Sequence, residues 1–509
     1  MIVKIFSAAL QGVDAFRVDL EVDFARAGMP AFTMVGLAEG AVRESRERVF
    51  SALKNSGLKL PAARITVNLA PADRKKEGSA YDLPLALGLI AASGTLPVEA
   101  VHGFFMAGEL SLAGEVKAVP GVLPLAILAR NEGARGLIAP LANAAEAAVV
   151  EGLPVYGVST LSEAVAVCAG GESAPQPQAA DAAAQDQAPD FPLDFSEVKG
   201  QESAKRAIEI AAAGGHNLLF IGPPGSGKTM LAQRIPSILP PLEFDEALEV
   251  SKIYSVAGLM PMDKGLIALR PFRAPHHTVS YAGLAGGGSY PRPGEISLAH
   301  RGVLFLDEFP EFQRPVLEIL RQPLEDGQVT ISRAGGALTY PARFMLVAAM
   351  NPCPCGYVND ERHACTCAPG QVQRYRARLS GPLLDRIDLH VEVPAVEYRD
   401  LRAADSDYSS ARMRGRISVA RARQAERYKN TACRSNAELS GRLLEKFCGL
   451  SGPENAFLEK AVQALGLSAR TYTRILRVAR TVADLAGEEN LAVQHLAEAL
   501  NCRVLDRQG

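Results

Sequence analysis

The residues with the most specific chemistry form one short glycine-rich stretch. Glycines let backbone N–H groups converge on phosphate oxygens, and the positive end of a following helix adds to the attraction. An apolar run at 217–221 precedes the stretch and predicts the strand that a phosphate-binding loop requires. We expect Lys228 to contact the β- and γ-phosphates of ATP and the Thr229 hydroxyl to bind Mg²⁺. The predicted loop consists of Gly222, Pro223, Pro224, Gly225, Ser226, Gly227, Lys228 and Thr229.

Two further apolar runs end in polar residues that fit ATP hydrolysis. The run at 303–306 is followed by Asp307 and Glu308, which predicts a Mg²⁺-holding carboxylate and a general base for the attacking water. Two acids at the end of a strand can also form a solvated turn, but the preceding phosphate loop favours the catalytic interpretation. Asn351 ends the run at 347–350, where its amide could orient the water or simply cap the strand.

The composition bounds the class of protein. A chain of 509 residues is expected to form two to four domains, and 48% hydrophobic with 22% charged residues is typical of a soluble globular protein. The net charge of −2 means that any contact with nucleic acid must come from local basic patches. No run of about 18 apolar residues predicts a membrane span. The N-terminus has no signal-peptide pattern, which predicts a cytoplasmic protein with reduced cysteines.

The chain divides at residues 171–190, which contain no aromatic or β-branched residue and predict a flexible linker. Residues 1–170 mix strand and helix patterns and predict an α+β domain. Residues 191–395 carry the phosphate loop and predict an α/β core with a parallel sheet and flanking helices. Residues 396–509 are almost wholly helical and predict a small lid. A basic helix at about 411–429 is expected to be solvated or to face another subunit, with a DNA-facing helix as the alternative.

The order of these motifs resembles an AAA+ ATPase. The order is phosphate loop, Asp–Glu strand, Asn strand, an arginine within 383–388 and a helical lid. The resemblance implies that Arg386 reaches the γ-phosphate of a neighbouring subunit, whereas a surface ion pair with Asp385 or Asp388 is the alternative. It also implies that Arg470 closes over the phosphates of its own subunit, with a solvated helix arginine as the alternative.

Four longer segments narrow the resemblance. Residues 270–277, 294–302, 351–356 and 468–481 are similar to the magnesium-chelatase-like AAA+ family of ComM and YifB, and the resemblance covers nearly the whole chain. It implies a homohexameric ring that binds ATP and Mg²⁺. It further implies a helicase that drives branch migration on single-stranded, forked or branched DNA during recombination in natural transformation, together with recombination proteins. A chelatase-type motor that remodels a protein partner, or an ATP-dependent protease, are the alternatives.

The N-terminal domain resembles an inactivated Lon-type protease domain. Residues 76–84 resemble the segment that carries the Lon nucleophile, but this position falls on Ala80, one residue after Ser79. Residues 113–117 resemble the segment with the catalytic lysine, here Lys117. A lysine base without a hydroxyl partner cannot perform acyl transfer, so we expect no peptidase activity unless Ser79 takes the place of the nucleophile.

Four cysteines predict a possible metal site. Cys353 and Cys355 form one C-x-C pair, and Cys365 and Cys367 form a second pair nine residues later. Four thiolates suit tetrahedral Zn²⁺, although C-x2-C is the usual spacing. His363 as a replacement ligand and a loop without metal are the alternatives.

Two segments carry candidate DNA contacts. Residues 328–343 predict a hairpin around Gly335 and Gly336, with Arg333 near its tip. In related ring helicases a hairpin at this position projects into the pore. A second insertion at 269–294 resembles another pore-facing element. Phosphate contacts would bind DNA of any sequence, and a purely structural pairing is the alternative for each arginine. The predicted contacts of the second insertion are Arg270, Arg273 and Arg292.

Overall fold

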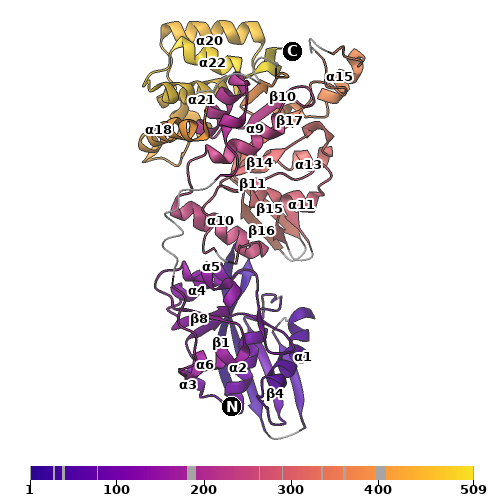
Figure 1. Ribbon diagram of the computed structural model, residues 1–509, viewed down its shortest axis with the longest axis vertical. Coiled ribbons are helices and arrows are strands. Elements are labelled where there is room, and N and C mark those ends of the chain that lie inside the picture. Colours follow the sequence, from indigo (N-terminus) through magenta and orange to yellow (C-terminus); the bar gives the residue numbers. More distant parts are fainter. Residues whose placement is uncertain are drawn as a thin grey trace.

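A computed structural model describes residues 2–26, 29–36, 40–76, 78–179, 191–262, 264–288, 291–333, 336–358, 363–396 and 408–507. The molecule is elongated, with the N-terminal domain at one end and the ATPase core and C-terminal helices at the other (Figure 1). In the described part of the chain no helix combines the length and the apolar character needed to cross a membrane.

The N-terminal domain is built on a mixed sheet of seven strands. Its elements are β1 (Ile2–Gln11), β2 (Asp14–Ala25), β3 (Ala31–Val35), α1 (Gly40–Asn55), β4 (Arg64–Ala70), α2 (Asp82–Ser93), α3 (Val98–Val101), β5 (Phe104–Met106), β6 (Glu109–Leu110), β7 (Val116–Lys117), α4 (Val122–Asn131), β8 (Gly136–Pro140), α5 (Leu141–Ala148), β9 (Val155–Val158) and α6 (Leu161–Ala169). The strand order is β3-β4-β2-β1-β5-β8-β9, and α2 is buried along its whole length. Of the predicted linker, residues 180–190 lie outside the described residues.

The ATPase core is built on a parallel sheet of five strands in the order β11-β14-β17-β10-β18. These strands are β10 (Leu218–Ile221), β11 (Phe272–Arg273), β14 (Val303–Leu306), β17 (Met345–Met350) and β18 (Leu389–Glu392). Because β17 lies between β10 and β14, the carboxyl ends of these three strands meet at one edge. The three strands are fully buried and apolar, as expected of a parallel sheet covered on both faces. The expected α/β core with a parallel sheet is confirmed.

Helices and hairpins connect these strands. They are α8 (Glu202–Gly214), α9 (Lys228–Arg234), α10 (Phe244–Ala257), α11 (Tyr281–Ala285), β12 (Gly286–Gly287), β13 (Arg292–Pro293), α12 (Glu295–Leu298), α13 (Arg314–Glu318), α14 (Arg321–Asp326), β15 (Gln328–Arg333), β16 (Gly336–Pro341), α15 (Pro369–Arg376) and α16 (Gly381–Leu384). The predicted hairpin is present as β15 and β16, which pair from Gln328–Pro341 to Arg333–Gly336. Val329, Ile331 and Tyr340 bury one face of the hairpin in the core.

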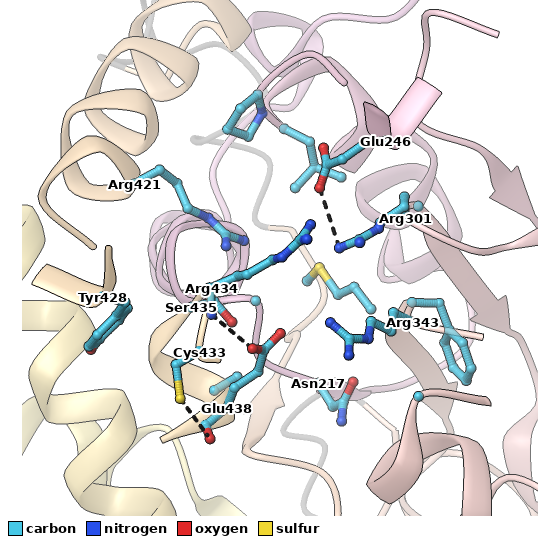
Figure 2. A pocket seen from close by; sticks show the side chains of 18 of the residues that line it. Asn217, Glu246, Arg301, Arg343, Arg421, Tyr428, Cys433, Arg434, Ser435 and Glu438 are labelled. Atoms are coloured by element: carbon cyan, nitrogen blue, oxygen red, sulfur yellow. Dashed lines mark hydrogen bonds and ion pairs between the residues drawn. The ribbon is translucent and has the colours of Figure 1, made fainter. Parts of the chain in front are cut away.

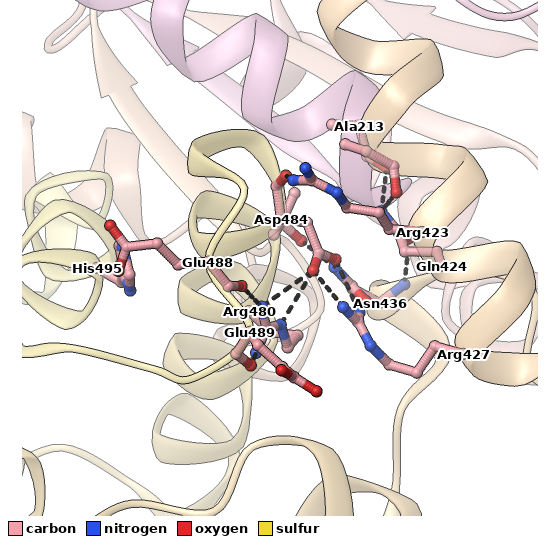
Figure 3. Close-up of polar contacts among 12 residues, drawn as sticks. Ala213, Arg423, Gln424, Arg427, Asn436, Arg480, Asp484, Glu488, Glu489 and His495 are labelled. Carbon is pink, nitrogen blue, oxygen red and sulfur yellow. Dashed lines mark hydrogen bonds and ion pairs between the residues drawn. The ribbon is translucent and has the colours of Figure 1, made fainter.

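The C-terminal part is helical, as predicted, and packs against α8. Its helices are α18 (Ser410–Tyr428), α19 (Gly441–Phe447), α20 (Gly452–Leu465), α21 (Ala469–Ala486) and α22 (Val493–Asn501). Buried Asp484 of α21 accepts hydrogen bonds from Arg427, Asn436 and Arg480 (Figure 3). Fully buried Arg480 also donates to the carbonyls of Glu488 and Glu489, at 2.6 Å each.

The basic helix α18 is solvated in part, since Arg412, Arg416 and Arg423 are exposed, but several of its arginines also make contacts within the chain. Arg416 pairs with Glu209, Arg421 donates to the Ala212 carbonyl, and Arg423 donates to the Asp484 carbonyl. These arginines therefore anchor α18 to α8 and α21 within the same chain. Sequence alone could not predict this, because the partners lie about 60 to 210 residues away.

The N-terminal domain contacts the ATPase core through α10. The backbone N–H groups of Gly121 and Leu123 donate to the carbonyl and hydroxyl oxygens of Ser255, at 2.9 and 3.3 Å. The Glu146 carboxyl is buried at this contact, and its desolvation raises its pKa. Lys252 pairs with Asp14 at the turn between β1 and β2. The domains are thus joined by packed side chains as well as by the connecting segment.

Candidate active site

The phosphate loop connects β10 to α9, as the sequence predicts. Gly225 and Gly227 have φ values of 75° and 92°, which residues with a Cβ adopt only with strain. A Cβ at Gly222 would lie 2.1 Å from the Val393 carbonyl oxygen. These glycines therefore allow a compact loop whose N–H groups precede the first turn of α9.

Lys228 lies within this loop with its ammonium group on neutral oxygens. It donates to the carbonyls of Gly222 and Pro223 at 2.8 Å each and to Asn351 Oδ1 at 3.2 Å. Burial lowers its pKa, and the charge of Asp307 acts in the opposite direction. The hydroxyl of Ser226 is buried and has no hydrogen-bond partner in the described part of the chain. Lys228 contacts no carboxylate among the described residues, and the same loop holds the unsatisfied Ser226 hydroxyl. This arrangement suits the binding of a triphosphate.

Thr229 and Asp307 supply adjacent oxygen ligands. The Thr229 hydroxyl donates to Asp307 Oδ2 at 2.5 Å, and Asp307 Oδ1 accepts from the Glu308 N–H at 2.9 Å. Hydroxyl and carboxylate oxygens are the hard ligands that Mg²⁺ prefers. The two residues come from neighbouring parts of the sheet edge and fit the predicted Mg²⁺ site.

Glu308 follows in a left-handed backbone conformation, with φ of 50°. Its carboxylate is 58% exposed, and Oε2 lies 3.0 Å from His277 Nδ1. Sequence reasoning did not place His277 in the ATP site. The sequence does place His277 four residues after β11. This position indicates a place in the ATP site only when β11 is known to pair with β14.

Arg386 lies near the amino ends of the parallel strands, opposite to the carboxyl ends where the phosphate loop lies. It precedes β18, which runs parallel to β10, whereas the phosphate loop follows β10. Its guanidinium is mostly buried and contacts Glu325 and the Pro382 carbonyl, not the two aspartates considered from sequence. Arg386 therefore faces away from the phosphate loop of its own chain.

Arg470 also lies near these amino ends, which differs from the expectation that it closes over its own chain's phosphates. Its guanidinium is 65% exposed and 3.9 Å from Asp385. The cause is the position of α21: Arg474, one turn further on, pairs with buried Asp388 immediately before β18. The first turn of α21 is thereby held at the edge opposite to the phosphate loop.

The predicted DNA contacts fall into two groups. Arg270 donates to Glu246 at 2.8 Å and to the Pro240 carbonyl at 2.6 Å, and Arg273 makes a two-pronged ion pair with Glu295. For these two arginines the structural pairing is the arrangement observed. Arg292 is exposed on β13, and Arg333 is the last residue of β15.

The four cysteines come together in one cluster. Their sulfur atoms all lie within 4.8 Å of one another, and none is in a disulfide. Contacts of 3.4, 3.5 and 3.8 Å between pairs of sulfurs match the separation of about 3.8 Å that tetrahedral Zn–S bonds of about 2.3 Å would give. The donor set and spacing therefore fit zinc. A Cβ at Gly356 would lie 2.4 Å from Pro224 Cδ, so this loop packs directly on the phosphate loop.

Comparison with known proteins identifies the family. Three family models match: "Magnesium chelatase, subunit ChlI" at residues 194–401, "Subunit ChlI of Mg-chelatase" at 20–143 and "Magnesium chelatase, subunit ChlI C-terminal" at 407–503. "Competence protein ComM" of Haemophilus influenzae is 46% identical over 508 residues, covering 99% of this chain and 97% of the relative. The chain belongs to the magnesium-chelatase-like family of ComM and YifB.

Other members and a distant relative agree with this assignment. "Uncharacterized protein YifB" of Salmonella typhimurium is 45% identical over 504 residues, covering 99% of this chain and 97% of the relative. "Magnesium-chelatase 38 kDa subunit" of Rhodobacter capsulatus is 25% identical over 329 residues, covering 60% of this chain and 85% of the relative. Membership of this AAA+ family implies ATPase activity and the use of ATP and Mg²⁺.

The N-terminal domain of this family member lacks a serine–lysine pair. Ser79 donates to Glu109, and Lys117 pairs with Glu115 at 2.6 Å. Among the described residues no hydrogen bond joins Ser79 to Lys117, and acyl transfer requires such an activated nucleophile. The loss of peptidase activity stays a prediction.

Proposed function

We propose that this chain is an ATP-driven DNA translocase that forms a hexameric ring and promotes branch migration of forked or branched DNA. The observation that carries the proposal is the position of the hairpin β15–β16 in the chain. It connects the strand that ends at Asp307 and Glu308 to the strand that ends at Asn351. A shift of either strand end during ATP turnover would move the base of the hairpin.

The exposed face of the hairpin suits a contact with the DNA backbone. Ser332 and Thr339 are exposed and Arg333 is at the end of β15, whereas the apolar side chains face the core. Hydroxyl and guanidinium groups bind phosphate oxygens without reading sequence, as a motor that moves along any DNA requires. Arg292 on the second insertion is a further candidate contact, whereas Arg270 and Arg273 position other elements.

The ATP site supports a division of roles among this chain's residues. Lys228 and the loop N–H groups would hold the phosphates, and Thr229 with Asp307 would hold Mg²⁺. Bound Mg²⁺·ATP supplies the cleavable phosphoanhydride and a divalent charge. Glu308 would accept the proton of the attacking water, and Asn351 would orient that water. His277 holds the Glu308 carboxylate and so links it to the insertion that follows β11.

The ring is proposed because Arg386 and Arg470, which the AAA+ resemblance assigns to the phosphates, lie away from the phosphate loop of their own chain. Arg386 and Arg470 lie at the sheet edge opposite to the phosphate loop, where a neighbouring subunit's nucleotide would meet them. Positive charge supplied by a neighbour would make hydrolysis depend on assembly. Mixed rings of Arg386→Ala and Lys228→Ala chains should therefore recover activity that neither variant has alone.

The biological setting is inferred from a relative. A full-length relative is named as a competence protein, which supports a role in recombination of incoming DNA during natural transformation, in the cytoplasm and with recombination proteins as partners. We further propose that the cysteine cluster holds one structural Zn²⁺ that braces the loop lying on Pro224.

ATPase assays with and without forked, single-stranded and duplex DNA test the main proposal. We expect stimulation by DNA and unwinding of forked substrates. Arg333→Ala should bring the ratio of DNA-stimulated to DNA-free turnover close to one. The matched control is Arg442→Ala, which removes an exposed arginine from α19. Turnover that ignores every DNA, or responds only to a protein partner, would refute the translocase and favour a chelatase-type motor.

A further inference from the structure

A cavity of about 780 Å³ lies between the ATPase core and the C-terminal helices. Its walls include residues directly before four of the parallel strands: Asn217, Gly302, Phe344 and Asp388. The cavity is therefore at the edge of the sheet opposite to the phosphate loop. The other wall comes from the end of α18 and the segment 429–438.

Three of the seven acidic residues that line the cavity are paired with arginines within the chain. Arg270 and Arg301 both pair with Glu246. Glu325 contacts Arg386 and buried Asp388 contacts Arg474. These pairs frame the cavity, and Glu243, Asp245, Asp326 and Glu438 line it without an ion pair among the described residues. Nine Arg and Lys residues line the cavity against seven Asp and Glu residues, so positive charge is in excess.

Four arginines of the cavity have no carboxylate at salt-bridge distance among the described residues: Arg343, Arg421, Arg434 and Arg477, of which Arg477 donates to the Leu439 carbonyl at 2.6 Å. Arg421 donates only to the Ala212 carbonyl, and burial together with the charge of Arg270 lowers its pKa to about 10. Glu438 accepts from the backbone N–H of Arg434, not from its guanidinium. Figure 2 shows Arg343, Arg421 and Arg434 directed into the same space from three different segments.

We propose that this cavity binds an oligophosphate through Arg343, Arg421 and Arg434. Guanidinium groups that converge in a cavity with an excess of positive charge repel one another, and a polyanion reduces this repulsion. Each guanidinium presents a planar fork of donors that matches phosphate oxygens. The volume lies within the range of about 300–1,000 Å³ that is typical of small-ligand sites.

The oligophosphate has two possible sources. It is either free in solution or part of the nucleotide held by the phosphate loop of a second copy of this chain. The second source rests on the proposed ring, and it extends the ring contact beyond Arg386, which lines the same cavity. Arg343 and Arg434 would then position the phosphates of the neighbour's ATP.

Calorimetric titration with tripolyphosphate tests for the free ligand. The titrated protein carries Lys228→Ala, which weakens binding at the phosphate loop. Its concentration is one at which sedimentation shows monomers. We expect binding that falls about 10-fold or more when Arg343→Ser and Arg434→Ser are added, because a charge-assisted hydrogen bond contributes about 1.5–3 kcal/mol. Both arginines are exposed, so these changes spare the core, and Arg442→Ser is the matched control.

Mixing experiments test the neighbour's nucleotide. Lys228→Ala chains have an intact cavity and a disabled loop, whereas Arg343→Ser/Arg434→Ser chains have the reverse. ATPase activity that returns only on mixing would identify the phosphates as those of a second copy. The proposal is overturned if tripolyphosphate binding does not depend on the two arginines and mixing restores nothing. A wild-type chain that fails to hydrolyse ATP would refute the proposed function separately, because the titration needs no turnover.

Discussion

Buried Asp484 should be one of the most sensitive positions for the stability of the C-terminal helices. Its carboxylate is inaccessible to solvent and accepts from Arg427, Arg480 and the Asn436 amide (Figure 3). The change Asp484→Asn keeps the volume but removes the negative charge between two guanidinium groups. Breaking a buried ion pair on one side costs about 3–5 kcal/mol, because the remaining charge stays buried without compensation. Arg480 keeps its two carbonyl partners, so most of the cost should fall on Arg427.

Urea unfolding measures this cost if the signal comes from the C-terminal helices. The chain contains no Trp, so Phe447→Trp would introduce a single probe, 5.5 Å from the Tyr428 ring in the parent structure. With a slope of about 1–3 kcal/mol per M urea, Asp484→Asn should lower the midpoint by at least about 1 M. Glu426→Gln on the same helix is the control, since Glu426 is 80% exposed and should change stability by less than about 0.5 kcal/mol.

A double-mutant cycle separates the pair from the rest of the network. Adding Arg427→Met to Asp484→Leu removes both charges, and the double variant should be more stable than the sum of the two single losses predicts, by about 0.5–3 kcal/mol. If Asp484→Asn costs no more than Glu426→Gln, or if the losses simply add, the argument from buried charge is wrong.

Three further predictions concern hydrolysis, metal and pH. Glu308→Gln should retain ATP binding but lower turnover about 10²- to 10⁴-fold, and wild-type turnover would contradict its role as a base. Elemental analysis should find one zinc per chain, lost when all four clustered cysteines become serine; a variant that keeps its zinc would exclude the cluster. His300 and Arg301 hold the pKa of Glu249 at about 2, below its ordinary value of 4.5. The folded state therefore gains stability above pH 4.5 and loses it as the pH falls toward 2. The difference in melting temperature between wild type and Glu249→Gln should narrow from pH 5.5 to 3, and a constant difference would contradict this assignment.

The site elements that sequence predicted are those fixed by residues adjacent in the chain. The phosphate loop needs a strand, glycines and a helix start within about a dozen residues, and each is where the sequence predicts it. The hairpin of β15 and β16 and the two cysteine pairs are equally local, whereas Gly335 of the predicted turn lies outside the described residues. Alternation of apolar and polar residues, glycine spacing and apolar runs are patterns of residues close together in the chain. The sequence alone therefore determined the core chemistry of the ATP site.

Only the tertiary structure decided which distant segments meet. The strand order places His277 beside Glu308 and puts Arg386 and Arg470 at the edge away from their own phosphate loop. It also uses arginines of α18 for packing and brings one of them, Arg421, to a cavity that Arg343 and Arg434 share. These outcomes depend on contacts between residues tens to hundreds of positions apart. No local pattern encodes such contacts, because burial and charge pairing are settled only when the sheet and helices pack together.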